Sequence, residues 1–200
     1  MTLDGATPRP ALVARASWGR YRGGVSGTLE LEIRPELPGE AATIRSVHEA
    51  AFGQPQEGAL VDALRAAGAL SASWVALEGG EAVAHVAFSP VRISPPRGEA
   101  GGAILGLAPM AVHPDRQRGG LGTVLLRRAL AALGRAGTPA VIVLGHAEYY
   151  PRFAFVPASR FGLRWDHDAP DEAFMALELI EGALSGPPGV VSYHSAFEAL

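Results

Sequence analysis

One short stretch sets the order of the fold: RQRGGLGT, at residues 116–123. It follows the apolar segment ILGLAPMAV (104–112) and precedes VLLRRALAALGRAG (124–137), whose apolar residues recur at helical spacing. Glycine weakens strands and helices alike, because it loses more backbone freedom on folding than any other residue. Three glycines at this junction therefore indicate a place where the chain needs bare backbone.

The segments on either side predict a strand, a helix and a second strand. Residues 103–112 are almost uniformly apolar, as in a strand buried on both faces, although Pro109 must mark an edge, a bulge or an open ladder. After the glycines, Gly137 ends the helix, and a short connection leads to the strand 140–144. Such short connections predict neighbouring, parallel strands. The helix buries a stripe of Leu121, Val124, Leu125, Ala129, Leu130 and Leu133.

The preceding part of the chain predicts further alternation of elements. LELEIR (29–34) alternates as a half-buried strand does, and Pro38 stands where the first turn of a helix is expected. A second helix is expected over 59–68. The pair Gly79-Gly80 predicts a hairpin between two apolar runs, because glycines tolerate the positive φ of tight turns. These patterns indicate an α+β fold with a mixed sheet.

The chain beyond residue 144 predicts a helical turn within 147–155, stopped by Pro151, and a strand over 172–179. Residues 1–28 have no sustained periodicity and are expected to form a flexible extension. The domain proper is expected to span 29–182. The remaining segment, 183–200, is expected to be docked or partly flexible.

Composition excludes several classes of function. The 200 residues are 48% hydrophobic with a net charge of −3, which suits a globular protein and gives no general case for nucleic-acid binding. There is no cysteine and no lysine, so thiol nucleophiles, disulfides and Schiff bases are ruled out. No apolar run approaches the ~20 residues that span a membrane. We expect a cytoplasmic protein without a membrane or nucleic-acid partner.

The glycine stretch suits an anion. It would join the carboxyl end of a strand to the amino end of a helix, where unpaired N–H groups and the helix dipole attract negative charge. A Walker A loop is excluded because it needs lysine. A dinucleotide fingerprint is weak, because Leu125 stands where the third glycine belongs and no acidic residue closes the next strand. A diphosphate remains the natural ligand.

The pattern Gln117-x-x-Gly120-x-Gly122 resembles the acetyl-CoA pyrophosphate loop of the GCN5-related N-acetyltransferase (GNAT) family, [RQ]-x-x-G-x-[GA]. The order of elements from 29 to 179 also resembles the family's. The sequence YPRFAF (150–155) is similar to its Y-x-x-x-G-F, with Ala154 in place of glycine. LGHAEYYPRFAFVPA resembles most the YhbS-type subgroup of predicted acetyltransferases. The resemblance implies a GNAT fold in one domain and acetyl-CoA as acyl donor, with no metal.

The resemblance also implies roles for individual residues. The strand before the loop would splay from its neighbour, so that the cofactor lies between the strands ending at Val112 and Leu144. Tyr150 would be the general acid that protonates the leaving thiolate, with Tyr149 as its competitor. Backbone groups of Met110, Ala111 and Val112 would bind the pantetheine, and Gln117, Arg118, Gly119, Gly120, Leu121, Gly122 and Thr123 would form the pyrophosphate loop.

One departure from the family concerns the general base. Many members carry a glutamate on the strand before the loop, but 103–112 has no carboxylate. His85, His113 and His146 are candidate substitutes, because histidine titrates near neutrality. The base stays unassigned.

The predicted function is transfer of acetyl to a primary amine by direct attack. We expect the amine to belong to a small molecule. The alternatives are a protein or peptide acetyltransferase, and a non-catalytic acyl-CoA-binding module. Family members often form dimers, so a homodimer is possible on the same resemblance.

Overall fold

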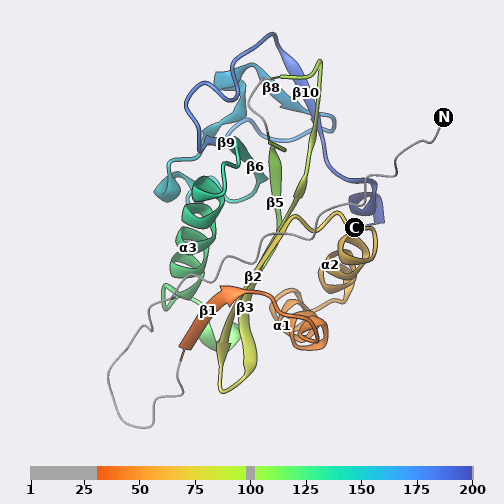
Figure 1. The fold of residues 1–200 in the computed structure, drawn as a ribbon, viewed down its shortest axis with the longest axis vertical. Coiled ribbons are helices and arrows are strands. Elements are labelled where there is room, and N and C mark those ends of the chain that lie inside the picture. The colour runs from red at the N-terminus through yellow and green to blue at the C-terminus, as the bar shows by residue number, and fades with distance from the viewer. Residues whose placement is uncertain (1–30, 98–101, 200) are drawn as a thin grey trace, which may run out of the picture.

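The computed structural model describes residues 31–97 and 102–199 and contains a large mixed sheet with helices on both faces (Figure 1). The predicted N-terminal extension, 1–28, lies outside the described residues. The elements of the large sheet are β1 (Leu31–Pro35), β2 (Ala72–Glu78), β3 (Glu81–Pro90), β5 (Leu105–Val112), β6 (Ala140–Leu144), β9 (Phe174–Glu178) and β7 (Val156–Pro157), in the order β1-β2-β3-β5-β6-β9-β7.

Within this sheet only β5 and β6 run parallel; the other neighbours are antiparallel. The parallel pair is the one that the short connections around the glycine stretch predict. The helix α3 (Leu121–Arg135) crosses one face and buries Leu125, Leu126 and Leu130 against β3, β5 and β6. Its apolar stripe is the reason it packs there.

The opposite face is covered by α1 (Ala41–Phe52) and α2 (Gln56–Ala66), as Figure 1 shows. Ile44 and Val47 of α1 and Val61 of α2 pack there on Val75 and Ala111 of the sheet. The sheet is thus apolar on both faces near its centre. This accounts for the nearly continuous apolar sequence of β5.

Two helix starts differ from the sequence prediction. α1 begins at Ala41, not near Pro38, because Pro38 and Gly39 form a turn that the Glu40 carboxylate closes by accepting a hydrogen bond from the Leu37 N–H at 2.7 Å. α2 begins at Gln56 rather than at residue 59, since its first turn is polar and leaves no apolar periodicity to detect.

The turn after β6 also differs from the prediction. It is a short 3₁₀ helix, η2 (Tyr150–Phe153), and Pro151 lies in its first turn instead of stopping it. A proline is tolerated there because the first N–H groups of a helix have no partner within the helix.

A second, smaller sheet joins segments that are far apart in sequence. It consists of β4 (Arg92–Ser94), β10 (Gly189–Ser192) and β8 (Leu163–Trp165), in the order β4-β10-β8, and lies at the top of Figure 1. Arg97 fastens it, because its guanidinium donates hydrogen bonds to the carbonyls of Phe161, Leu184 and Pro187. Residues of the C-terminal segment are therefore part of the packed domain.

Candidate functional site

The central feature of the site is a fork between β5 and β6. The two strands pair only through Leu105 with Val141 and Gly106 with Ile142, although β5 continues to Val112. Beyond Gly106, Pro109 has no N–H to give to a ladder. Near it the pairing of β5 with β3 shifts between Val86 and Phe88. The strand is thus held by β3 on one side and open toward β6 on the other.

The glycine stretch lies at the open end of this fork. Gln117 follows a 3₁₀ turn, η1 (Pro114–Arg116), and donates a hydrogen bond from Nε2 to the Val112 carbonyl at 3.1 Å. Arg118 adopts a positive φ of 60°, and Gly120 has φ 82° as N-cap of α3, with no side-chain hydrogen bond. The amides of the first helical turn therefore stay available to a bound anion.

The three glycines of the loop have different surroundings. A Cβ at Gly122 would lie 3.1 Å from Val112 Cγ2, 3.1 Å from Met110 Cε and 3.2 Å from the Tyr149 hydroxyl oxygen. A Cβ at Gly120 would meet nothing within 4 Å. Gly122 thus lets α3 approach β5 closely, whereas the backbone at Gly119 and Gly120 is exposed. This is an open cradle suited to phosphate oxygens.

The two arginines beside the loop differ in whether their charge is already paired. The Arg116 Nε donates to the Glu78 carboxylate at 2.8 Å, so its charge is already paired. Arg118 is exposed at the loop itself. Thr123 belongs to the first turn of α3. The cationic group that the loop can offer to an anion is therefore Arg118 rather than Arg116.

The two tyrosines after β6 face different parts of the site. The Tyr150 ring lies over Gly145, where an added Cβ would be 3.0 Å from its Cδ2, at the end of β6. Tyr150 is 8% exposed, and burial, with a smaller effect from Tyr149, raises its pKa. Tyr149 instead points its hydroxyl toward Gly122 and Thr123. Tyr150 thus stands at the fork and Tyr149 at the loop.

The three candidate histidine bases are scattered. His113 accepts a hydrogen bond from the Asp115 N–H at 3.3 Å and so caps the turn η1. His146 is exposed before η2. His85 is 0% exposed on β3, on the face covered by α1, and its Nδ1 lies 2.8 Å from Nε2 of His48. The structure does not bring them together.

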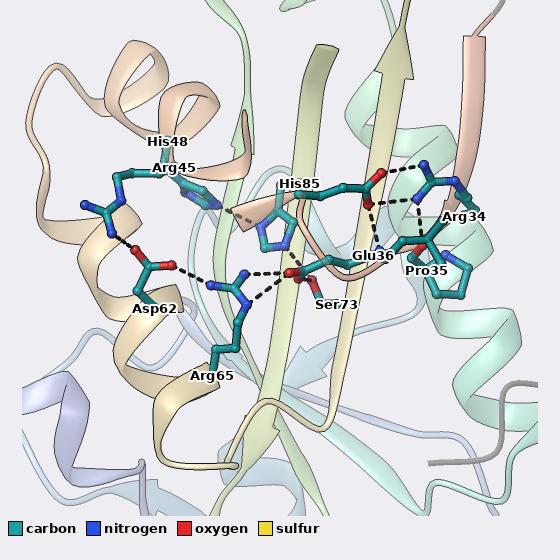
Figure 2. A network of polar contacts seen from close by, with 11 residues as sticks. Arg34, Pro35, Glu36, Arg45, His48, Asp62, Arg65, Ser73 and His85 are labelled. Carbon is teal, nitrogen blue, oxygen red and sulfur yellow. Dashed lines mark hydrogen bonds and ion pairs between the residues drawn. The ribbon is translucent and has the colours of Figure 1, made fainter. Parts of the chain in front are cut away.

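Figure 2 shows the network of polar contacts to which the buried His85 belongs. The Ser73 hydroxyl donates to the Glu36 carboxylate and must therefore accept from His85 Nε2, 2.8 Å away. It follows that His85 Nδ1 is the acceptor for the Nε2–H of His48. Arg65 in turn donates from Nε to Glu36 at 3.0 Å. Because both ring nitrogens are occupied, His85 has no free lone pair for an amine proton.

His48, the other half of the pair, was not found by sequence reasoning. It is 0% exposed, and burial lowers its pKa to about 4, against an opposing effect of Asp62. Burial likewise lowers the pKa of His85, assisted by His48 and Arg65. Both rings are neutral at pH 7. The available signal was position, because His48 follows Ile44 by one helical turn on the buried face of α1.

Most of the sequence-predicted binding residues lie together along the end of β5 and the glycine loop, whereas the candidate histidines lie apart. Met110 and Val112 contact Gly122, and Gln117 binds the carbonyl of Val112, which joins strand and loop. Ala111 points to the opposite face, toward α1. Tyr150 stands at the end of β6, across the fork.

In residues 31–97 and 102–199, no group of three histidines or carboxylates could hold a metal, and no helix could cross a membrane.

Comparison with known families and proteins gives a consistent result. A model described as the acetyltransferase (GNAT) family matches residues 23–155. The chain is 35% identical over 166 residues to the uncharacterized N-acetyltransferase YhbS of Escherichia coli K12, covering 82% of this chain and 97% of YhbS.

Solved structures are similar over comparable lengths. The crystal structure of E. coli YhbS in complex with CoA has a TM-score of 0.78 and 32% identity, covering 88% of this chain and 96% of YhbS. A GNAT family acetyltransferase from Brucella melitensis, in complex with acetyl-CoA, has a TM-score of 0.67 and 40% identity, covering 84% and 99%.

The contacts of Gly122 predict a local packing effect. Gly122→Val should destabilise the protein by about 1–3 kcal/mol, because the branched side chain would press on Val112 and Tyr149. Gly119→Val is the matched control, since a Cβ there would meet only the Arg116 carbonyl oxygen at 3.7 Å. Urea unfolding measures both. Equal losses in the two variants would contradict the close approach of α3 to β5.

The His48–His85 pair predicts a pH-dependent stability. Both pKa values are lower in the folded protein than the ordinary value of about 6.5, so the unfolded chain binds more protons as pH falls below that value. The contribution of these two histidines to the free energy of unfolding is therefore fully present above pH 6.5 and is lost as the pH falls toward 4. Each histidine contributes at most about 1.4 kcal/mol per pH unit.

Urea unfolding at several pH values between 7 and 5 tests this expectation. His48→Gln keeps a donor for His85 but does not titrate, so the slope of stability against pH should decrease. His167→Gln changes an exposed histidine and is the matched control. An unaltered slope in His48→Gln would refute the assignment.

Proposed function

Because the chain belongs to the GNAT family of acetyltransferases, we propose that it transfers acetyl from acetyl-CoA to a primary amine of a small molecule. The family and fold predicted from the sequence are confirmed, namely a mixed α+β GNAT fold and an acyltransferase. The identity of donor and acceptor for this chain, and the roles of its residues, are the proposal. It is supported by the CoA and acetyl-CoA held in the two similar structures.

The observation that carries the proposal is the fork. β5 leaves β6 after Gly106, the glycine loop stands at the open end of the splay, and Tyr150 stands across it. An extended donor with a diphosphate at one end and a thioester at the other fits such a site. The loop would bind the diphosphate through the amides of Arg118 to Thr123, with Gln117 fixing the loop to β5.

The remaining length of β5 would hold the pantetheine arm. Within the proposed stretch Met110, Ala111 and Val112, the alternation of a strand turns the backbone groups of Met110 and Val112 toward the open side. Those of Ala111 turn toward β3, in phase with His113, whose N–H donates to the Val83 carbonyl. A backbone N–H of the same strand would stabilise the oxyanion that develops on the thioester carbonyl.

The chemistry proposed is direct attack. The neutral amine nitrogen forms a bond to the thioester carbonyl carbon, and the carbon–sulfur bond breaks as the tetrahedral adduct collapses. Tyr150 donates its phenolic proton to the departing thiolate. The amine releases its own proton to solvent, and the Tyr150 phenolate regains a proton from solvent. Tyr150 carries its proton at neutral pH, since burial raises its pKa above the ordinary phenol value. No side chain of β5 can serve as base, since the strand has no carboxylate.

A binding and turnover screen tests the function. Acetyl-CoA should raise the thermal unfolding midpoint of the protein and NAD should not, because the loop lacks the dinucleotide fingerprint. A panel of small amines, peptides with free amino termini and lysine-containing peptides, followed by thiol release, should reveal turnover with a small amine. Stabilisation by acetyl-CoA without any turnover would favour the non-catalytic acyl-CoA-binding module. The absence of a carboxylate from β5 is the reason for testing this alternative.

Tyr150→Phe tests the acid. It should lower kcat by about 100-fold or more while the Kd for acetyl-CoA changes less than threefold, because the ring packing stays and the proton is lost. Tyr149→Phe is the matched control, since its hydroxyl faces the loop, and should lose far less in kcat. Steady-state kinetics with the amine found in the screen would provide both values. If Tyr149→Phe showed the larger loss in kcat, the assignment would pass to Tyr149.

A further inference from the structure

The closed end of the fork is filled by a side chain from the C-terminal segment. Gly106 is the last residue of β5 that pairs with β6. A Cβ on Gly106 would overlap the Cε1 atom of Tyr193 and lie 2.8 Å from Cγ1 of Val91. The Tyr193 ring therefore occupies the space that a side chain at position 106 would take. No sequence motif pointed to this residue.

The strand register fixes the face on which Tyr193 lies. Leu105 and Leu107 belong to the cluster beneath α3, so the position between them, Gly106, points to the opposite face. Ser89 pairs with Gly106 from β3 and shares that face. The chain reaches this side after β10 and ends in the turn η4 (Ser195–Ala199), which packs beside α2 (Figure 1).

Two buried hydroxyl groups at this place lack partners among the described residues. They are Oγ of Ser89, which is 0% exposed, and the phenol of Tyr193. The Leu144 backbone lies near the Tyr193 phenol. Tyr150 is also close enough to act electrostatically on that phenol. Buried polar groups without partners are rare in folded proteins and call for a specific explanation, such as a ligand.

The course of the donor leads to the same place. If the diphosphate lies at the glycine loop beside Val112, an arm that follows β5 runs toward Gly106. The distance along the strand is about 20 Å, at ~3.3 Å per residue. Since β5 and β6 are joined at Gly106, the arm cannot pass further between them. Its acyl end therefore lies at the fork, against whatever closes that end.

We propose that Tyr193 closes the acyl end of the donor site and restricts the donor to acetyl-sized groups. The inference rests on the proposed function, because it requires an acyl-CoA in the fork. The ring, packed on Gly106 and Phe197, is the steric stop. The hydroxyls of Tyr193 and Ser89 belong to the same wall. A short acyl group leaves these hydroxyls uncovered, where they can contact the thioester oxygen or the incoming amine. Tyr193 is thus a specificity-determining residue.

Calorimetric titration of acetyl-CoA and butyryl-CoA tests the proposal without knowledge of the acceptor. The unmodified protein should bind acetyl-CoA at least tenfold more tightly than butyryl-CoA. Tyr193→Ala should shift the ratio of the two Kd values toward butyryl-CoA by about tenfold or more, because two further methylenes gain apolar burial. Tyr193→Phe keeps the ring and is the matched control, so the preference for acetyl-CoA should persist.

The outcomes distinguish the proposed function from the role of Tyr193. Failure of the unmodified protein to bind any acyl-CoA would overturn the proposed function itself. Binding of acetyl-CoA with an unchanged ratio in Tyr193→Ala would overturn the inference alone. Loss of the preference in Tyr193→Phe would show that the hydroxyl, not the ring, is responsible, and would also overturn it. Tyr193→Leu, which preserves apolar packing but is shorter, gives the same test if Tyr193→Ala does not fold.

Discussion

The rest of the structure depends on how early two parallel strands stop pairing. β5 and β6 share two residue pairs and then separate, so the backbone of β5 loses its neighbour on one side for most of its length. In a closed sheet such unpaired groups would be costly when buried, and they need other partners. The antiparallel ladder with β3 keeps β5 in place, and α3 spans the gap on one face. The opening is thus bordered by β5, β6 and α3.

This constraint also gives the glycine loop its position. Because β5 has no strand partner on its β6 side at Val112, the loop can turn back on it, and the Gln117 side chain replaces a missing ladder bond by binding the Val112 carbonyl. The close contact at Gly122 then fixes the amino end of α3 beside the strand. The loop and the fork are therefore parts of one packing arrangement.

Much of this could be predicted from sequence, because the signals are local. The apolar run of β5, the glycines that follow it and the stripe of α3 lie within a few turns of one another and obey simple periodicities. Pro109 correctly indicated a disturbed ladder, since a missing N–H has the same effect in any strand. The helix starts at Ala41 and Gln56 were missed because side-chain contacts of Glu40 and a polar first turn carry no periodic signal.

The remainder depends on contacts between distant segments. His48 and His85 are 37 positions apart, and nothing in either neighbourhood announces the other. Likewise β10 is a four-residue strand whose pairing with β4 and β8 supplies the reason for its conformation. Tyr193 follows it directly. Such residues become visible when the topology is known, since packing rather than propensity determines them.

The attachment of the small sheet bears on the absence of lysine from the chain. Arg97 reaches carbonyls of Phe161, Leu184 and Pro187, which come from separate segments, with two nitrogens of one planar group. An ammonium concentrates its donors on a single atom and could not span these acceptors. The chain uses arginine for all of its basic side chains, and at this position the geometry also requires arginine. The guanidinium of Arg97 joins three segments through its shape rather than through its charge.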